Sequence, residues 1–393
     1  MSDTKNFVDL QAGFYNALAQ GLGYSPSDPF QVIQPSPPLV SGDDENELIW
    51  NYLNAIPPFS LTQNTVFSGG NQFLADYQGV MSALQAAPND FQATVGPVCF
   101  AAYQQALKDG AVKPGPVQFR NWALVNGACS SVAVSGASAL ARAMLDPIFA
   151  AQMNVLPYQP AGTDPVDFSP GYKTMLKQLK NAPSRAFQVA AGNWNTNVSS
   201  TWTKGSTSGI FGLWGGSSSS STLSEKFASS GVGLTAKFAN VLPFNAVPGV
   251  WYSSSAFGLA FNNPGKAPWA PSSPINWANT FGPNGNMQRF CTSLLIANSM
   301  NIVVTSNATY SDADQKEIQS HSSAGLWPFY SSGGGSGSST SVSFTASGNM
   351  QVTITSKSGV PVVIGCIVLP AAQYLGHEVK ASELLTTNFY AAA

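Results

Sequence analysis

Residues 193–203 read Asn-Trp-Asn-Thr-Asn-Val-Ser-Ser-Thr-Trp-Thr, and residues 209–216 read Gly-Ile-Phe-Gly-Leu-Trp-Gly-Gly. In the first stretch every odd position is polar, whereas the large apolar side chains occupy even positions, at Trp194, Val198 and Trp202. Successive side chains of a β-strand point to opposite faces of the sheet. The stretch therefore predicts a strand with one apolar face.

The alternation returns after a run of serines at residues 217–221. Leu223 and Phe227 have polar neighbours, and the alternation is regular again over residues 232–238. Residues 193–238 therefore predict a long amphipathic hairpin with two Ser/Thr-rich strands. The apolar residues of its glycine-flanked tip are Ile210, Phe211, Leu213 and Trp214.

The sequence before residue 183 has the apolar spacing of helices. Leu10, Phe14 and Leu18 recur every four residues, and similar stripes follow further along the chain. Near Pro183 the period changes from that of a helix to that of a strand, and Ser, Thr, Gly, Val and Trp become abundant. We therefore predict an α+β protein, with a helical domain over residues 1–183 and an antiparallel β-rich domain over residues 184–393.

The β-rich half contains further local patterns. Thr292–Thr305 predicts two buried strands around a turn at Asn298–Asn301. Val342–Ile354 alternates on both sides of a Ser-Gly-Asn turn and predicts a second hairpin, whereas Val360–Leu369 is apolar and predicts a buried strand. The acids of residues 312–317 are typical of a helix start, because the glycine and final acid of a calcium loop are absent.

The composition limits the kinds of partner. Charged residues form 9% of the chain, against roughly 25% in typical soluble proteins. The net charge is -2, so the chain offers no basic surface for nucleic acid. A surface with so little charge does little to keep molecules apart, and we therefore expect a homo-oligomer.

The chain has few residues suited to catalysis or metal binding. His321 and His377 are its only histidines, and motifs for a metal, a phosphate, a dinucleotide or a serine nucleophile are absent. We therefore predict a non-enzymatic protein with no metal and no organic cofactor. The four cysteines lie in apolar or small-residue surroundings, which favours buried free thiols. A disulfide between Cys99 and Cys129 is the alternative left open.

The first functional hypothesis is a pore-forming, toxin-like protein that inserts the Ser/Thr-rich hairpin into a lipid membrane. Lipid tolerates a backbone only if every amide is paired, so an inserting β-segment must alternate lipid-facing and lumen-facing residues and close into a barrel. A β-strand needs roughly 9–11 residues to span a bilayer, and residues 193–203 meet that length. Lys204, Glu225 and Lys226 would then have to face the lumen or the interface.

The second hypothesis is a non-enzymatic structural or binding module, either a self-assembling subunit or a lectin-like protein that binds a glycan. Low charge and abundant Gly, Ser and Asn are equally usual in such proteins. Trp251, Tyr252, Trp269, Trp277 and Trp327 are candidates for stacking on sugar rings, but aromatic residues more often fill cores, and we favour that interpretation.

The N-terminal residues do not form a Sec signal peptide, and no run of 18 apolar residues is present. These two observations predict a protein that stays in the cytoplasm or is released by a non-Sec route. They also exclude a transmembrane helix as the source of any membrane activity, so a membrane-active protein would depend on the hairpin of residues 193–238.

Overall fold

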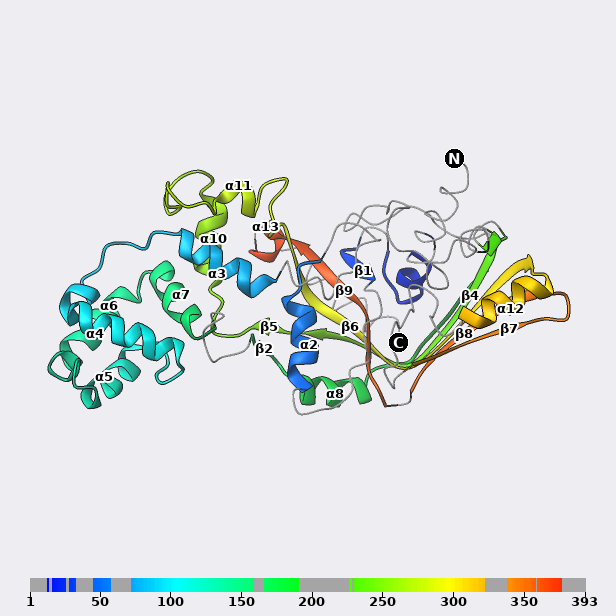
Figure 1. Ribbon diagram of the computed structural model, residues 1–393, viewed down its shortest axis with the longest axis horizontal. Coiled ribbons are helices and arrows are strands. Elements are labelled where there is room, and N and C mark those ends of the chain that lie inside the picture. Colours follow the sequence, from blue (N-terminus) through cyan, green and yellow to red (C-terminus); the bar gives the residue numbers. More distant parts are fainter. Residues whose placement is uncertain are drawn as a thin grey trace.

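The structure is a computed structural model, and its architecture is mixed α+β, as predicted. Helices lie mostly in residues 46–180, and an antiparallel sheet of seven strands contains the later strands. Figure 1 shows an elongated molecule, with a group of helices at one end and long strands that reach toward the other end. The described residues are 13, 16–25, 28–32, 45–57, 72–158, 166–190, 223, 226–227, 230–321, 338–357 and 359–376.

One helix begins where the sequence supplies both a capping residue and a proline. The carboxylate of Asp146 accepts hydrogen bonds from Ile148 N and Phe149 N, and Pro147 is the first helical residue. Among the described residues before 181, residues 16–21 are also helical, and the helices with described bounds are α2 (Glu45–Asn54), α3 (Phe73–Ala83), α4 (Phe91–Lys108), α5 (Pro116–Val125), η1 (Ser130–Val132), α6 (Ala133–Ala143), α7 (Pro147–Val155), η2 (Leu156–Tyr158) and α8 (Tyr172–Lys180). The later ones are α10 (Ser254–Asn262), α11 (Trp277–Thr280), α12 (Asp312–His321) and α13 (Ala371–Tyr374).

All strands of the main sheet pair antiparallel, in the order β1-β9-β6-β4-β3, and β8 pairs with both β6 and β7. The predicted hairpin at Val342–Ile354 and the strand at Val360–Leu369 are confirmed as β7–β8 and β9. The strands are β1 (Phe30–Val32), β3 (Arg185–Val189), β4 (Val232–Asn245), β6 (Arg289–Thr309), β7 (Ser338–Phe344), β8 (Asn349–Ser356) and β9 (Val362–Pro370). A separate pair consists of β2 (Phe168–Ser169) and β5 (Val247–Pro248).

The turn predicted at Asn298–Asn301 is wrong, because β6 runs through it as one strand of 21 residues. On one side β6 pairs with β4 on both sides of Ser299, which has a positive φ of 52°. On its other side β6 pairs with β9 in its first half and with β8 in its second half. Pairing along both edges supplies the backbone hydrogen bonds that an isolated Asn-rich segment would otherwise find in a turn.

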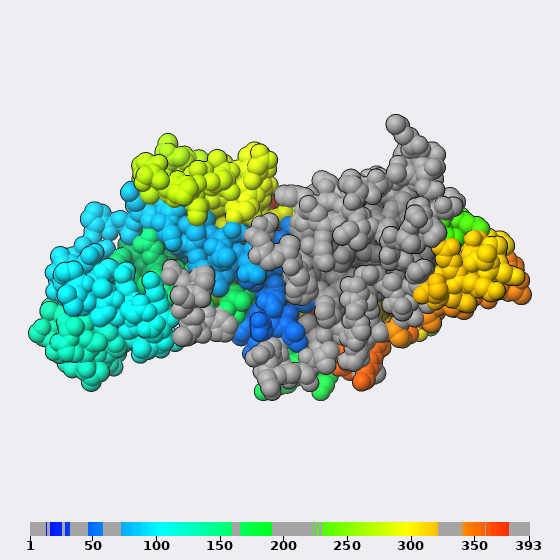
Figure 2. Space-filling view, viewed as in Figure 1, coloured from blue at the N-terminus to red at the C-terminus, as the bar shows by residue number. Residues whose placement is uncertain are grey.

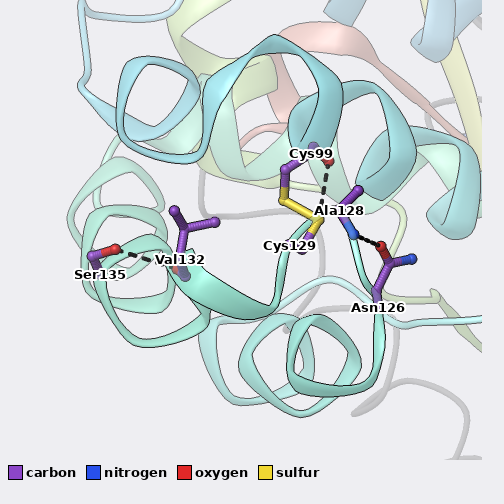
Figure 3. The surroundings of a disulfide bond; sticks show 6 residues. All are labelled: Cys99, Asn126, Ala128, Cys129, Val132 and Ser135. Atoms are coloured by element: carbon purple, nitrogen blue, oxygen red, sulfur yellow. Dashed lines mark hydrogen bonds between the residues drawn. A yellow bond between two sulfur atoms is a disulfide. The ribbon is translucent and has the colours of Figure 1, made fainter.

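We call α4–α7 the helical module, and its own hydrophobic core contains a disulfide between Cys99 of α4 and Cys129 (Figure 3). The prediction of free thiols is therefore wrong for these two cysteines. It is confirmed for Cys291 and Cys366, which are free and buried. Sequence alone leaves the pairing open because the two bonded cysteines are 30 residues apart and are brought together only by helix packing.

The buried apolar side chains form three clusters. The module core lies among α4–α7. The central core joins α2, α3, α7 and α8 to the β9 half of β6, so it contains side chains from both sides of residue 183. The domain boundary predicted at that residue stays a prediction. The distal core covers one face of β4, β6 and β8 at the other end of the sheet.

The central core is rich in aromatic rings. Phe73 of α3 has ring centroids of Trp251, Phe290 and Tyr374 within 5.8 Å. The indole nitrogens of Trp251 and Trp269 donate hydrogen bonds to backbone carbonyl oxygens at 3.0 and 2.9 Å. The interpretation of Trp251 and Trp269 as core residues is confirmed by their burial.

Asp76 of α3 gives the stability of the fold a dependence on pH. Its Oδ1 accepts a hydrogen bond from Asn286 Nδ2, and its buried Oδ2 has no hydrogen-bond partner among the described residues. Burial raises the pKa of Asp76 to about 6, against the lowering effect of the Asn286 hydrogen bond. The folded state therefore favours the protonated carboxyl, so the contribution of Asp76 to the free energy of unfolding is largest at low pH and is lost as the pH rises through about 6.

We expect the free energy of unfolding to fall by about 1 kcal/mol between pH 5 and pH 7.5, after allowance for solvent screening of a partly exposed carboxyl. Urea unfolding at the two pH values measures this change. Asp76→Asn should remove the dependence, because its amide does not titrate. An Asn variant with the wild-type difference between the two pH values would assign the effect to another group.

Candidate functional site

The segment between β3 and β4, residues 190–231, contains the predicted tip and the greater part of the predicted hairpin. The two strands pair antiparallel from Arg185 opposite Phe238 to Val189 opposite Leu234. The chain therefore leaves β3 and re-enters β4 at the same end of two neighbouring strands, as in any hairpin connection. We call residues 190–231 the first insertion.

Most predicted site residues lie outside the described residues. They are the tip residues Ile210, Phe211, Leu213 and Trp214 and the strand residues Trp194, Val198 and Trp202. Their assignment to an amphipathic hairpin stays a prediction. Leu223 and Phe227 are described and are both buried in the distal core.

Leu223 and Phe227 are helical in the structure, as is Lys226, which differs from the strand predicted for them. The physical reason is that a spacing of four residues satisfies both periods. Four residues equal two periods of a strand and about one turn of a helix. The side chains of Leu223 and Phe227 can therefore face the same apolar surface in either conformation. The predicted alternation over Val232–Phe238 is confirmed, because its even-numbered residues are buried as part of β4.

The end of the first insertion is fixed to β6 and α12 by polar contacts. Lys226 Nζ lies 2.9 Å from Asp314 Oδ2 and 5.1 Å from the ring centroid of Tyr310. The hydrogen bond from Lys226 is the main reason that the pKa of the Asp314 carboxyl is lowered. Both charged side chains are partly exposed, so this ion pair contributes at most about 1 kcal/mol.

A second set of contacts fixes the residues just before β4. Ser230 Oγ lies 2.8 Å from Ser306 Oγ, which lies 3.4 Å from the hydroxyl of Tyr310. Gly231 O accepts a hydrogen bond from Asn307 N at 3.1 Å. We call Leu223, Lys226, Phe227, Ser230 and Gly231 the clasp, because these residues hold the end of the first insertion on the distal core.

Sequence reasoning missed the clasp. Lys226 and Asp314 are 88 positions apart, and Ser230 and Ser306 are 76 apart. Neither pair belongs to a motif with fixed spacing, so the sequence contains no signal that would join them. The local prediction that a helix starts near Asp312 is confirmed by α12, in which Ser311 Oγ accepts a hydrogen bond from Asp314 N.

The described residues contain no group of three or more His, Cys, Asp or Glu side chains placed to hold a metal ion. Within the same residues no single helix is long and apolar enough to cross a membrane, although the pair Ser130–Ala143 and Pro147–Tyr158, bent by 117°, meets that test of length and composition together.

Comparisons with known proteins do not assign this arrangement to a family. Function has to be inferred from the residues and contacts described above. The chain matches no protein family model, no curated protein and no solved structure.

Proposed function

We propose that the protein forms pores by inserting the first insertion into a lipid bilayer as a β-hairpin that extends β3 and β4. The observation that supports this proposal most strongly is the register of those two strands. Val189 lies opposite Leu234, and each earlier residue of β3 lies opposite a correspondingly later residue of β4. Continued beyond Val189 without a shift, this pairing fixes a partner for every residue of an extended hairpin.

The continued register places the turn of the hairpin in the predicted tip. Trp194 would lie opposite Ser229, Trp202 opposite Ser221 and Ile210 opposite Leu213. The two residues left for the loop are Phe211 and Gly212. A two-residue hairpin loop needs a positive φ at its first residue, which Phe211 disfavours, so the register agrees with the position of the glycine-flanked tip but not with a favoured two-residue turn.

The continued register also sorts the side chains into two faces. Residues directly opposite each other in an antiparallel pair share a face, and here even positions of the first strand oppose odd positions of the second. One face would then contain the apolar residues Trp194, Val198, Trp202, Ile210, Leu213, Leu223 and Phe227. The other face would contain mainly Asn, Ser and Thr, as expected of a barrel lumen, together with Trp214 next to the loop.

Three charged residues test this assignment. Lys226 falls on the polar face, where it would line the lumen. Lys204 falls on the apolar face but just beyond the predicted spanning stretch 193–203, at the level of the interface. Glu225 falls opposite Val198 on the apolar face, so it is the one charge of the three that the continued register places neither in the lumen nor at the interface, and it counts against an unshifted register.

Insertion requires the clasp to open. Leu223 and Phe227 must leave the distal core, and Lys226 must leave Asp314. Burial of each large apolar side chain stabilises the folded protein by about 1.5–3 kcal/mol. Leu223 and Phe227 would gain a similar stabilisation from contact with lipid after insertion. The clasp therefore stabilises the soluble form without making the inserted form inaccessible.

The face assignment can be tested with an environment-sensitive fluorophore on single introduced cysteines. We expect Val198→Cys and Ser221→Cys to show a blue shift when vesicles are added. The neighbouring Asn197→Cys and Thr222→Cys sites should stay in water, because they face the lumen. The native free cysteines are buried and should not compete for the label in the folded protein.

Release of a dye trapped in the vesicles gives the second readout. If the protein forms pores, the wild-type protein should release the dye. The blue shift should then occur at even positions of the first strand and at odd positions of the second strand. Dye release without alternation would refute the hairpin. A protein that releases no dye and shows no shift at any site is not pore-forming, and the structural or binding module of the alternative hypothesis would then remain.

A further inference from the structure

A bulge in β6 brings the two free cysteines of the central core onto one face of the sheet. Cys291 lies opposite Val368 of β9, and Leu294 lies opposite Cys366, with a shift of register between Cys291 and Ser293. Three steps along β6 therefore match two steps along β9, which changes the parity of the alternation. As a result both cysteines face the central core, as diagonal neighbours on adjacent strands.

The two thiols lie against each other and away from the surface. The hydrogen bond with the Cys366 thiol is the main reason, ahead of burial, that the pKa of the Cys291 thiol is raised. Both side chains are buried, and neither belongs to a disulfide. The helices α2 and α3 pack on this face of the sheet through the central core, and Figure 2 shows them in shades of blue at the molecular surface. The pair is therefore enclosed by protein and presents two sulfur atoms at one point.

A buried positive charge lies beside the sulfur pair. Arg289 is two residues before Cys291 in β6 and is 3% exposed. Burial lowers the pKa of its guanidinium to about 10, and the interaction with Cys366 opposes that change. The guanidinium also donates a hydrogen bond to the side chain of Gln31, which is opposite Cys366 in β1. A negative charge on the sulfur atoms would therefore be balanced by a cation that the fold already contains.

The number of ligands and this charge select the kind of ion that the pair could bind. Structural zinc sites and iron–sulfur clusters take four ligands, whereas the described residues contain no group of even three His, Cys, Asp or Glu side chains. Soft thiolate ligands also select Cu(I), which has a filled d shell and is stable with two thiolates in a linear arrangement. Two thiolates and one monovalent ion carry one net negative charge, which Arg289 neutralises. A divalent ion would leave the buried guanidinium uncompensated.

We propose that Cys291 and Cys366 bind one Cu(I) ion as thiolates in the central core, between β6 and β9. Each thiol releases its proton to solvent, and each sulfur atom forms one bond to the ion, so no electron is transferred. Because the pair is enclosed, the ion enters during folding, while β9 and β6 are still apart. The bound ion then links the two strands and stabilises the folded protein. This site is independent of the proposed pore formation.

Refolding in the presence of copper tests this proposal. The protein is unfolded in urea without a thiol reductant, so that the Cys99–Cys129 disulfide stays closed, and is refolded under nitrogen with the Cu(I)–acetonitrile complex. After removal of unbound metal, we expect one equivalent of copper per chain and a higher midpoint of urea unfolding than in the copper-free protein. X-ray absorption should show two thiolate ligands. Zinc supplied in the same way should bind to less than a tenth of an equivalent.

Cys291→Ala and Cys366→Ala are the test variants, and each should lower copper binding below a tenth of an equivalent while circular dichroism shows a folded protein. Cys99→Ala with Cys129→Ala is the matched control, which removes the other sulfur pair and should keep the full equivalent. If the single variants do not refold, two thiolate ligands in this control decide the matter, because its only cysteines are the proposed ligands.

Three results would overturn the site. They are a wild-type protein that refolds without binding copper, a folded single variant that keeps the copper, and a disulfide between Cys291 and Cys366 found by peptide mapping after refolding with copper. One bound equivalent with two thiolate ligands would instead establish the site and contradict the sequence-based prediction of a protein without a metal.

Discussion

Val198→Lys is expected to reduce dye release at least tenfold, whereas Asn197→Lys is expected to leave it within about twofold of the wild type. Val198 lies in the middle of the predicted spanning stretch 193–203, on its apolar face. Both variants carry Glu225→Gln as well, because the continued register places Glu225 opposite Val198, where it would pair with the new lysine. A lysine that faces lipid near the middle of a bilayer costs about 2–4 kcal/mol in a β-barrel, which is a factor of about thirty or more for each subunit. The neighbouring position faces the lumen, where a charge stays hydrated.

Two measurements make this comparison decisive. Dye release is recorded over a range of protein concentrations, and urea unfolding shows whether both variants keep the stability of the soluble form. Equal loss of release in the two variants would refute the assignment of faces. Loss in Asn197→Lys alone would show that the register between the two strands is shifted by one residue.

Trp251→Ala is expected to lower the free energy of unfolding by about 3–5 kcal/mol. The Trp251 ring is fully buried, and its centroid lies 5.2 Å from that of Phe73, 5.6 Å from Tyr77 and 5.8 Å from Phe168. Removal of the indole leaves a cavity among these rings and removes the hydrogen bond to Asp167 O.

Urea unfolding followed by far-ultraviolet circular dichroism measures this loss. Trp251→Phe is the matched control, because it keeps a ring in the cavity and removes the hydrogen bond, and it should lose about half as much. A loss below about 1 kcal/mol in the alanine variant would show that the central core collapses around the cavity. Dye release at a temperature where Trp251→Ala is folded should match the wild type, since Trp251 lies outside the proposed hairpin.

Local patterns in the sequence were sufficient to predict those elements whose residues interact with near neighbours. The alternation over Val232–Phe238 predicts part of β4, and the Ser-Gly-Asn turn predicts the β7–β8 hairpin. The acids of residues 312–317 predict the start of α12. In each case the decisive interaction spans only a few residues, so neighbouring positions in the sequence are enough to predict it.

Long-range pairing decided the elements that sequence reasoning missed. β6 crosses its Asn-rich centre because β4 pairs with it there, and Asn240 and Asn298 are far apart in sequence. The clasp and the disulfide depend on the packing of distant segments in the same way. The register that supports the proposed function also comes from the structure, since the sequence predicts alternation in each strand but not which residues face each other.

The pairing of β1 with β9 restricts when the protein can fold during its synthesis. Phe30 lies opposite Ile367, and the side chain of Gln31 accepts a hydrogen bond from that of Arg289, which is 258 positions away. At about 5–20 residues per second, a ribosome makes β9 on the order of tens of seconds after β1. Until then β1 has no strand to pair with, and the first half of β6 presents an unpaired edge. The central sheet is therefore completed only after translation has passed residue 370, and a nascent chain that stalls earlier would expose that edge to its neighbours on the polysome.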